Sequence, residues 1–297
     1  MRILLAVVAS CLMVTGALSQ DGARAYFLLP EDTNIASLTA YHLHTEAGAT
    51  KIDVGVLVAS YRRTIDVGGN AGAFLIGLPV GSLSGAIDTG FGIVPQNNNL
   101  ALGDFFVGGE LGLFGSPSLS PLDYSQYKPG FRAGVAAKLF MPTGDYNSNR
   151  LANLGQNRWA LHASLPISYV LGDSMIDPAI TTIEIVPSVH IFGNNNDAVG
   201  PASVSSQDPL WKLEGHVTHT FSPTIWAALD AYYENGGRTS SDGVQTAKAR
   251  ESFSLGATLG LVLSQSLALR LTYVEQVYSN TPNAVGRGVE LTTAFMF

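Results

Sequence analysis

Charged residues are scarce in this sequence. The 297 residues include 16 Lys and Arg and 23 Asp and Glu, which together make up 13% of the chain. A typical soluble domain has roughly 25%, because a soluble protein needs charge to cover its surface. The composition therefore indicates that much of the surface is hidden or faces lipid.

Long apolar runs are missing once the N-terminal region is passed. A helical membrane protein needs about 20 consecutive apolar residues for each crossing. Apolar residues here are spread over short alternating segments instead. The other structure that pairs every backbone N–H and C=O group within a bilayer is a closed β-barrel. The pattern thus argues against a helical bundle and favours a barrel.

Cysteine is nearly absent, since Cys11 is the only one. It lies in a predicted export signal, so the mature chain has no disulfide framework, cysteine-ligated metal site or thiol nucleophile. The formal net charge of −7 argues against nucleic acid as a partner, because such binding needs basic patches. We expect no cofactor.

The N-terminus resembles a secretory signal peptide over residues 1–19. Arg2 supplies the positive charge, and Ile3 to Leu18 is apolar with small residues, as expected for such a signal. Cleavage after Ser19 is favoured, and cleavage after Ala25 is the alternative. Residues 20–34 then form an N-terminal lead segment. A lipoprotein signal ending at Cys11 and a membrane anchor are the less favoured interpretations.

Residues 35–297 show the alternation of β-strands. In Ser252–Leu263 the leucines share one face with Phe253 and Ala257, whereas serine, threonine and glycine share the other. Transmembrane strands have this pattern over about 9–11 residues. The fold class predicted is all-β: a transmembrane antiparallel up-and-down barrel of the bacterial outer-membrane type. A soluble β-sandwich would alternate too, but would rarely combine it with so little charge and an export signal.

About twelve strands can be counted, an even number as in bacterial barrels. The first two are the least certain. The predicted starts are Ile35, Asp53, Ala71, Gly103, Phe131, Trp159, Thr181, Leu210, Thr224, Ser252, Leu267 and Gly288.

Connection lengths alternate between short and long, as they do between periplasmic turns and external loops. The turns near Ser222 and Ser266 are tight, whereas polar stretches such as Ser84–Ala101 and Pro142–Arg158 are long. Gly115–Gly130 is an exception, because it is long where a short turn is expected.

The C-terminal strand ends in an aromatic residue, Phe297. Val289, Leu291 and Phe295 share its face, which predicts a lipid-facing strand with the last ring at the membrane interface. The ending resembles the signal read by the outer-membrane assembly machinery, so that machinery and outer-membrane lipid are the expected partners.

A motif lies in the middle of the chain. Leu139-Phe140-Met141-Pro142-Thr143-Gly144-Asp145-Tyr146 is followed by Asn149-Arg150-Leu151-Ala152-Asn153-Leu154-Gly155 and by Asn157-Arg158-Trp159. Together with the opening Ala25–Asn34, it resembles the outer-membrane family named for the MetA pathway of phenol degradation. The resemblance implies a barrel that moves small hydrophobic or aromatic compounds, and hence a small hydrophobic ligand.

The residue types of the motif also predict a loop with a defined conformation. Proline stops a strand, glycine permits tight turns, and Asp or Asn side chains can bond nearby backbone. Arg150 and Arg158 could pair with Asp145. The loop is either an inward constriction that contacts a ligand or a segment whose fixed shape serves assembly. Its candidate residues are Pro142, Gly144, Asp145, Asn149, Arg150, Asn153 and Gly155.

Most strand charges fall on the face opposite the apolar one, which is the lumen of the predicted barrel. Arg or Lys in lipid would cost about 2–4 kcal/mol at the bilayer midplane, whereas in a lumen they can pair or stay hydrated. These charges either form a structural network or line a narrow path. The candidates are Arg132, Lys138, Arg158, His162, Glu184, Lys212, Glu214, His216, Asp230 and Arg270.

Three functions fit this sequence, in order of preference. The first is a passive channel for small hydrophobic or aromatic compounds. The second is a structural or adhesive surface barrel acting through its long loops. The third is an outer-membrane hydrolase, which would need His162 or His216. We predict no catalytic activity, because the sequence carries no Gly-x-Ser-x-Gly, His-Glu-x-x-His or phosphate-loop motif.

Overall fold

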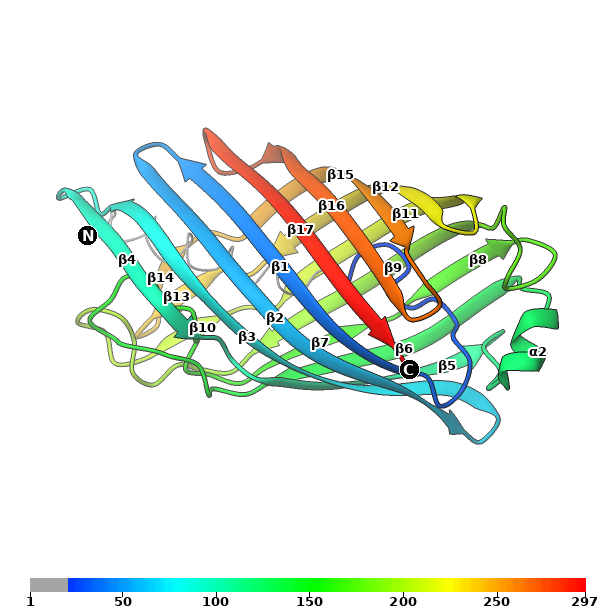
Figure 1. Ribbon diagram of the computed structural model, residues 1–297. Coiled ribbons are helices and arrows are strands. Elements are labelled where there is room, and N and C mark those ends of the chain that lie inside the picture. Colours follow the sequence, from blue (N-terminus) through cyan, green and yellow to red (C-terminus); the bar gives the residue numbers. More distant parts are fainter. Residues whose placement is uncertain (1–20) are drawn as a thin grey trace.

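The computed structural model describes residues 21–297, which form a ring of tilted strands (Figure 1). The predicted signal peptide and its cleavage after Ser19 lie outside the described residues. The strands of the ring are β1 Asn34–Ala47, β2 Thr50–Val67, β3 Asn70–Asp88, β5 Phe106–Phe114, β6 Phe131–Phe140, β7 Ala160–Ser164 with β8 Ile167–Leu171, β9 Thr181–Phe192, β11 Leu210–Ser222, β12 Ile225–Gly236, β15 Arg250–Val262, β16 Leu267–Ser279 and β17 Ala284–Met296.

The ring is closed by pairing of the last strand with the first. Antiparallel partners run from Ile35 opposite Met296 to Ala47 opposite Ala284, and β11 closes onto β9. β7 and β8 occupy one position, since both pair with β6 and β9. Counted so, the wall has twelve strands. The predicted barrel and strand number are confirmed, and each strand begins within four residues of its predicted start.

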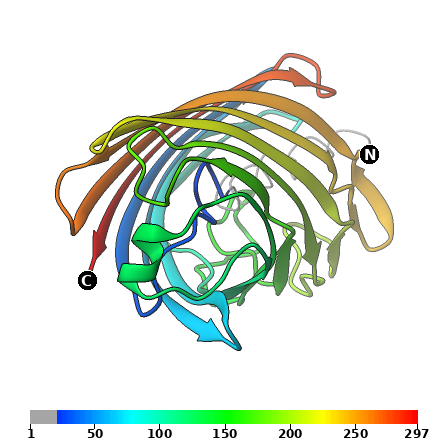
Figure 2. The same ribbon diagram turned by 90° about the vertical axis from the view of Figure 1, so that its right-hand side faces the viewer.

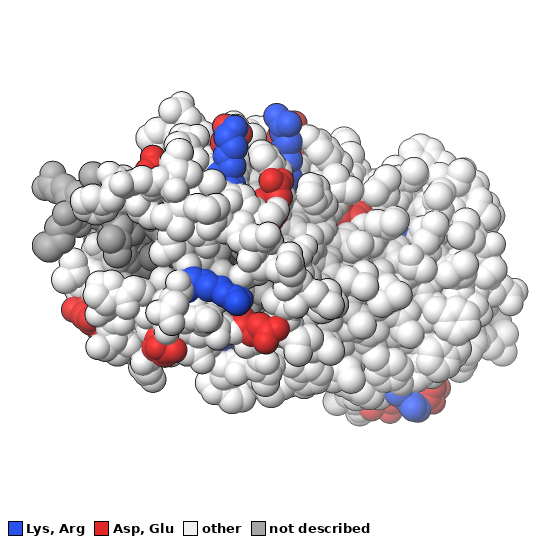
Figure 3. Space-filling view, turned by 60° about the vertical axis from the view of Figure 1, so that its left-hand side comes forward, with Lys and Arg blue, Asp and Glu red and all other residues white. Residues whose placement is uncertain are grey.

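The two faces of the wall differ as the alternation predicted. On β15, Leu255 is 48% exposed on the outside, whereas Thr258 is 3% exposed on the inside. Figure 3 shows a broad part of the surface without charged side chains. This apolar outer surface suits hydrocarbon, and the chain is an outer-membrane β-barrel. No helix within residues 21–297 is long and apolar enough to cross a membrane.

The two ends of the barrel differ in their connections. The end that carries the C-terminus has tight turns such as Gly68-Gly69, and we take it as periplasmic. The opposite, extracellular end carries most of the long connections. They contain β4 Ile93–Leu102, which pairs with β3, and a separate sheet of β10 Ser205–Gln207, β13 Thr239–Ser241 and β14 Val244–Ala247.

One predicted loop is largely strand. Ser84–Ala101 was expected to be a polar loop, but β3 continues to Asp88 and returns as β4. The amide-rich residues Gln96, Asn97 and Asn98 have register partners on β3. Polar side chains gave the appearance of a loop, because a hairpin that projects beyond the membrane needs no apolar face.

The long connection at the periplasmic end has a structural reason. Residues 115–130 contain the short helix α2 Pro121–Gln126, capped by the Ser120 side chain. The Glu31 N–H donates to the carbonyl of Leu119 over 2.9 Å, and the Tyr124 hydroxyl donates to the carbonyl of Leu28 over 3.0 Å. This connection thus holds the N-terminal segment at the periplasmic mouth (Figure 2).

Two prolines interrupt the wall where β7 meets β8. The Leu165 N–H donates to the carbonyl of Pro187, and the Gly134 N–H donates to that of Pro166, each over 2.9 Å. Proline has no N–H, so neither of these pairs can form its second bond. Two neighbouring ladder bonds are therefore missing from the wall.

The lipid-facing surface predicts a depth-dependent response to charge. Leu255→Arg places a guanidinium near the middle of β15 and should lower the free energy of unfolding by about 2–4 kcal/mol. Leu263→Arg, beside a periplasmic turn, should cost only about 0–1 kcal/mol. Urea unfolding in lipid vesicles measures both values. Equal effects of the two substitutions would contradict the assigned membrane position.

Candidate functional site

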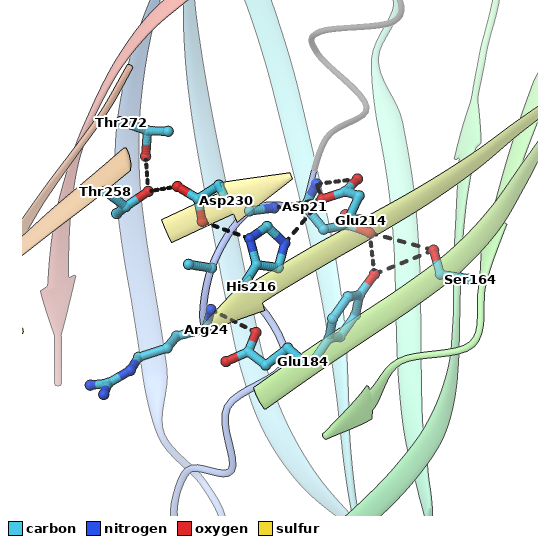
Figure 4. Close-up of polar contacts among 12 residues, drawn as sticks. Asp21, Arg24, Ser164, Glu184, Glu214, His216, Asp230, Thr258 and Thr272 are labelled. Atoms are coloured by element: carbon cyan, nitrogen blue, oxygen red, sulfur yellow. Dashed lines mark hydrogen bonds and ion pairs between the residues drawn. The ribbon is translucent and has the colours of Figure 1, made fainter. Parts of the chain in front are cut away.

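Residues 21–33 of the lead segment lie inside the ring of strands (Figure 2). Ala23 and Leu28 are almost completely buried there. Buried backbone N–H groups need acceptors, and the wall supplies them as carboxylates. The N–H groups of Asp21 and Gly22 donate to Glu214 on β11 over 3.2 Å, as Figure 4 shows for Asp21.

A second carboxylate anchors the next part of the segment. The Arg24 N–H donates to Glu184 on β9 over 3.0 Å. Its guanidinium donates to the hydroxyls of Thr218 and Thr220, each over 2.9 Å. It also lies 4.6 Å from the centroid of the Trp226 ring, a distance at which a cation–π attraction forms. These contacts fix the segment against β9, β11 and β12.

Asp21 carries the segment's own buried charge. Its carboxylate pairs with the ammonium of Lys138 on β6 and accepts a hydrogen bond from the Tyr26 hydroxyl over 2.7 Å. Burial by itself raises the pKa of Asp21, but the attraction of Lys138 and of His162 outweighs it, and the pKa falls from 3.8 to about 2. Asp21 is therefore ionised at neutral pH.

Across the lumen wall, His216 joins two carboxylates. Its Nδ1 lies 2.7 Å from Asp230 Oδ1 and its Nε2 lies 3.5 Å from Glu214. The Thr258 hydroxyl donates to Asp230 over 2.7 Å and contacts the Thr272 hydroxyl at 2.9 Å. Figure 4 shows this chain of contacts running from the lead segment to β16.

Several other strand charges are also paired. Glu234 accepts Lys212 at 3.1 Å and Arg250 at 2.8 Å, and Arg270 donates to Glu290 over 2.6 Å. Pairing limits the cost of removing these charges from water. The lumen therefore holds many charges of both signs, most of which are neutralised locally.

The ten lumen candidates lie on the inner side of the wall, and eight of them are buried. Lys138 and Arg270 are partly exposed and contact the lead segment. Arg158 lies just before β7, with its guanidinium 4.6 Å from the Phe192 ring centroid. His162 stacks on His190, with ring centroids 4.1 Å apart. The structure thus brings together most candidates around the lead segment, with Arg158 farther toward the extracellular end.

Sequence reasoning missed the partners that the lead segment provides. Asp21, Arg24 and Tyr26 were not among the candidates. Neither were Arg250 and Arg62 on β2, which pairs with Glu110 on β5. The available signal was the presence of two charged residues, Asp21 and Arg24, in a segment that belongs to no strand. Such charges need partners elsewhere in the fold.

The motif loop, residues 141–159, folds into the extracellular half of the lumen. Ala152 and Leu154 are buried in an apolar cluster with Val54, Leu83 and other wall residues. Asp104 fixes the two sides of the loop, since it accepts the N–H groups of Gly144 over 3.0 Å and Gln156 over 2.9 Å. The loop narrows the lumen from this end.

The expected pairing of Asp145 with arginine is wrong. The Asp145 carboxylate accepts the N–H of Leu102 over 2.6 Å, and Arg158 donates to Gln156 and Gln207. A short side chain next to the end of β4 reaches that backbone group more readily than a distant guanidinium. Asn153 donates to the carbonyls of Asn147 and Arg150, the backbone-bonding role expected of such residues.

Two glycines of the motif allow its two sides to touch. A Cβ built at Gly155 would lie 2.6 Å from the carbonyl carbon of Gly144, and one at Gly144 would lie 2.8 Å from the Gly155 Cα. Only glycine fits where backbones approach this closely. The remaining motif residues are exposed: Pro142, Asn149 and Arg150.

Among residues 21–297, no group of three or more His, Cys, Asp or Glu side chains is arranged to hold a metal ion.

The glycine contact predicts a specific weakness. Gly155→Ala forces the loop apart and should destabilise it by about 1–3 kcal/mol, the usual cost of overpacking. Gly130→Ala is the control, since a Cβ there meets nothing within 4 Å. Hydrogen exchange of residues 141–159 measures the effect. Equal protection in both variants would show that the backbone contact is unimportant.

Docking of the lead segment should weaken in acid. The folded pKa of Asp21 lies below its ordinary value, so its ion pair contributes above pH 3.8 and is lost as the pH falls toward about 2. A solvent-sensitive dye on Ala25→Cys, the only thiol expected in the mature chain, should report release in that range. Asp21→Asn removes the charge and should abolish this pH step. A step of the same size in both proteins would contradict the assignment.

Comparison with known proteins places this architecture among bacterial barrels. An outer membrane channel from Pseudomonas putida F1 matches with a TM-score of 0.74 and 18% identity, over 94% of this chain and 100% of that chain. The transport unit of the autotransporter AIDA-I from Escherichia coli matches with a TM-score of 0.50 and 9% identity, over 100% of both chains. At these identities the likeness shows a shared fold.

No curated protein matches the chain significantly. The profile of one protein family does, over residues 30–290. That range covers nearly all of the barrel and agrees with the resemblance seen in the motif loop. The chain therefore belongs to the family described as "Putative MetA-pathway of phenol degradation".

Proposed function

We propose that this protein is a passive outer-membrane channel for small hydrophobic or aromatic compounds. The observation that carries the proposal is the space left inside the barrel. A cavity of about 110 Å³ lies on the extracellular side, and one of about 340 Å³ adjoins the lead segment. A wall of twelve strands encloses more space than its own side chains fill.

The electrostatics of the lumen favour neutral cargo. Lys212, Arg250 and Arg270 are each matched by a nearby carboxylate, so an ion entering the lumen would meet charges that are already paired. Aromatic and aliphatic side chains also line the cavities, among them Tyr41 and Trp226. Membership in a family named for phenol degradation supports cargo of this class.

The remaining assignments belong to the same proposal. Residues 1–19 serve as the signal peptide, 20–34 as the lead segment and 35–297 as the barrel. The strand ending at Phe297 is read by the outer-membrane assembly machinery, and its exposed Phe295 and Phe297 contact lipid.

The other two functions have less support. An adhesive barrel would project its long loops outward, but the motif loop buries Ala152 and Leu154 within the barrel. A hydrolase based on His216 would need a hydroxyl for that base to activate. Both ring nitrogens of His216 face carboxylates instead. His162 does contact a hydroxyl, that of Ser164 at 3.3 Å, but both side chains are buried. We therefore propose a channel without catalytic activity.

A strain lacking the protein tests the proposal by uptake of labelled phenol. The wild-type gene should restore uptake, whereas Ser254→Trp should lower it several-fold because it fills the extracellular cavity. Leu255→Trp, on the lipid face of the same strand, is the matched control and should restore uptake fully. Glucose uptake checks that the outer membrane is intact. Equal phenol uptake with and without the protein would refute the channel.

A further inference from the structure

Two cavities of the lumen lie against the same sector of the wall. The extracellular one is bordered by β1, β2, β12, β15, β16 and β17. The inner one lies between the lead segment and chiefly β1, β2, β3, β16 and β17. Tyr41 lines both. Two spaces that share a lining side chain are separated by little more than that side chain and its neighbours.

The partition between the cavities is an ion pair. Glu290 lines the extracellular cavity and Arg270 lines the inner one, and they are joined by a hydrogen bond of 2.6 Å. Arg270 also donates to the carbonyl of Ala23 over 3.2 Å. An arginine side chain has several rotatable bonds, so it can swing aside while both backbones stay in place.

The lead segment is held mainly from other parts of the wall. Glu184 on β9 and Glu214 on β11 accept its N–H groups, and Lys138 on β6 pairs with Asp21. In the ring order, β9 lies opposite β1. A molecule moving along β16, β17 and β1 therefore does not have to break these anchors.

The lining of the extracellular cavity defines the chemistry of its ligand. Leu43, Ile52 and Val54 give it an aliphatic side, and Ser252, Ser254 and Thr272 give it a hydroxyl-bearing side. Its charges come as opposed groups, with Arg250 bonded to Glu234 at 2.8 Å. An anion would face Glu234 and Glu290, and a cation would face Arg250 and Arg287. The fit is to a neutral molecule with one apolar edge and one hydroxyl-bearing edge.

We propose that the extracellular cavity binds a neutral hydroxylated ring, and that this ligand passes along β16, β17 and β1 beside a docked lead segment. The Arg270–Glu290 pair and Tyr41 form the gate between the two cavities. This inference rests on the proposed function and specifies its ligand class and its route.

Locking the lead segment tests the route. Asp21→Cys with Lys138→Cys places two thiols where an ion pair now stands, in a mature chain expected to have no other cysteine. A short bis-methanethiosulfonate reagent bridges them, and a reductant releases the bridge in the same folded protein. The assay is influx of labelled catechol, a neutral ring whose two hydroxyls lie on one edge, into proteoliposomes, corrected for protein-free vesicles.

We expect influx to be the same with the bridge closed and open. Loss of influx on closing the bridge, restored by the reductant, would show that the lead segment must move and would overturn the route. Influx no greater than in protein-free vesicles in every state, including the unmodified wild type, would instead refute the channel itself.

Removing the gate tests the role of the ion pair. In the bridged protein, Arg270→Ala should raise catechol influx several-fold. The double variant Arg270→Ala/Glu290→Ala should do the same without leaving a half-buried carboxylate unpaired. Arg238→Ala is the control, because that residue pairs with Asp208 at the extracellular end, outside both cavities. Unchanged influx in the folded double variant would overturn the gate.

Ligand charge provides the last comparison. Hydroxybenzenesulfonate has the same ring size but a permanent negative charge, and the wild-type barrel should exclude it. Influx of the two compounds at equal rates would contradict the neutral-ring site.

Discussion

Backbone hydrogen bonding across the β1–β17 seam is the interaction on which the rest of this structure depends. Asn34 and Phe297 exchange two backbone hydrogen bonds of 3.0 Å, and the pairing continues to the opposite end of both strands. Lipid offers no partner for an open edge, so only a closed ring is stable there. Closure gives every strand a lipid-facing side and a lumen-facing side. Within the membrane, charged side chains must lie on the lumen-facing side.

That division creates a problem inside the barrel, because a dozen strands bring many charges together in a poorly hydrated space. The lead segment is part of the solution. It supplies N–H groups to Glu214 and Glu184, a carboxylate to Lys138, and a guanidinium to the Trp226 face. In return the wall satisfies the backbone of a segment that forms no strand. The lead segment and the wall thus satisfy each other's buried hydrogen-bonding groups.

The sequence predicted the wall well and the lumen contacts poorly. Alternation is local, so Ser252–Leu263 reveals β15 without knowledge of its neighbours, and inward residues such as His216 and Asp230 follow from the same parity. By contrast, the contact of Asp21 with Lys138 joins residues 117 positions apart. It depends on ring closure and strand order, and neither produces a periodic pattern in the sequence. The same reason hid the partner of Asp145 and the docking of residues 115–130.

The two prolines at the β7–β8 break, Pro166 and Pro187, weaken the pairing of strands in the wall. Opposite Pro166 and Pro187, the carbonyls of Gly134 and Leu165 have lost their ladder donors. Elsewhere, separating two strands in hydrocarbon means exposing bonded groups that nothing else can satisfy. At this spot part of that resistance is already gone, and the small side chains of Ala137 and Ala163 lie beside it. In a barrel stiffened by its own backbone, these strands are therefore held together by fewer hydrogen bonds along this stretch than where both bonds of each pair form.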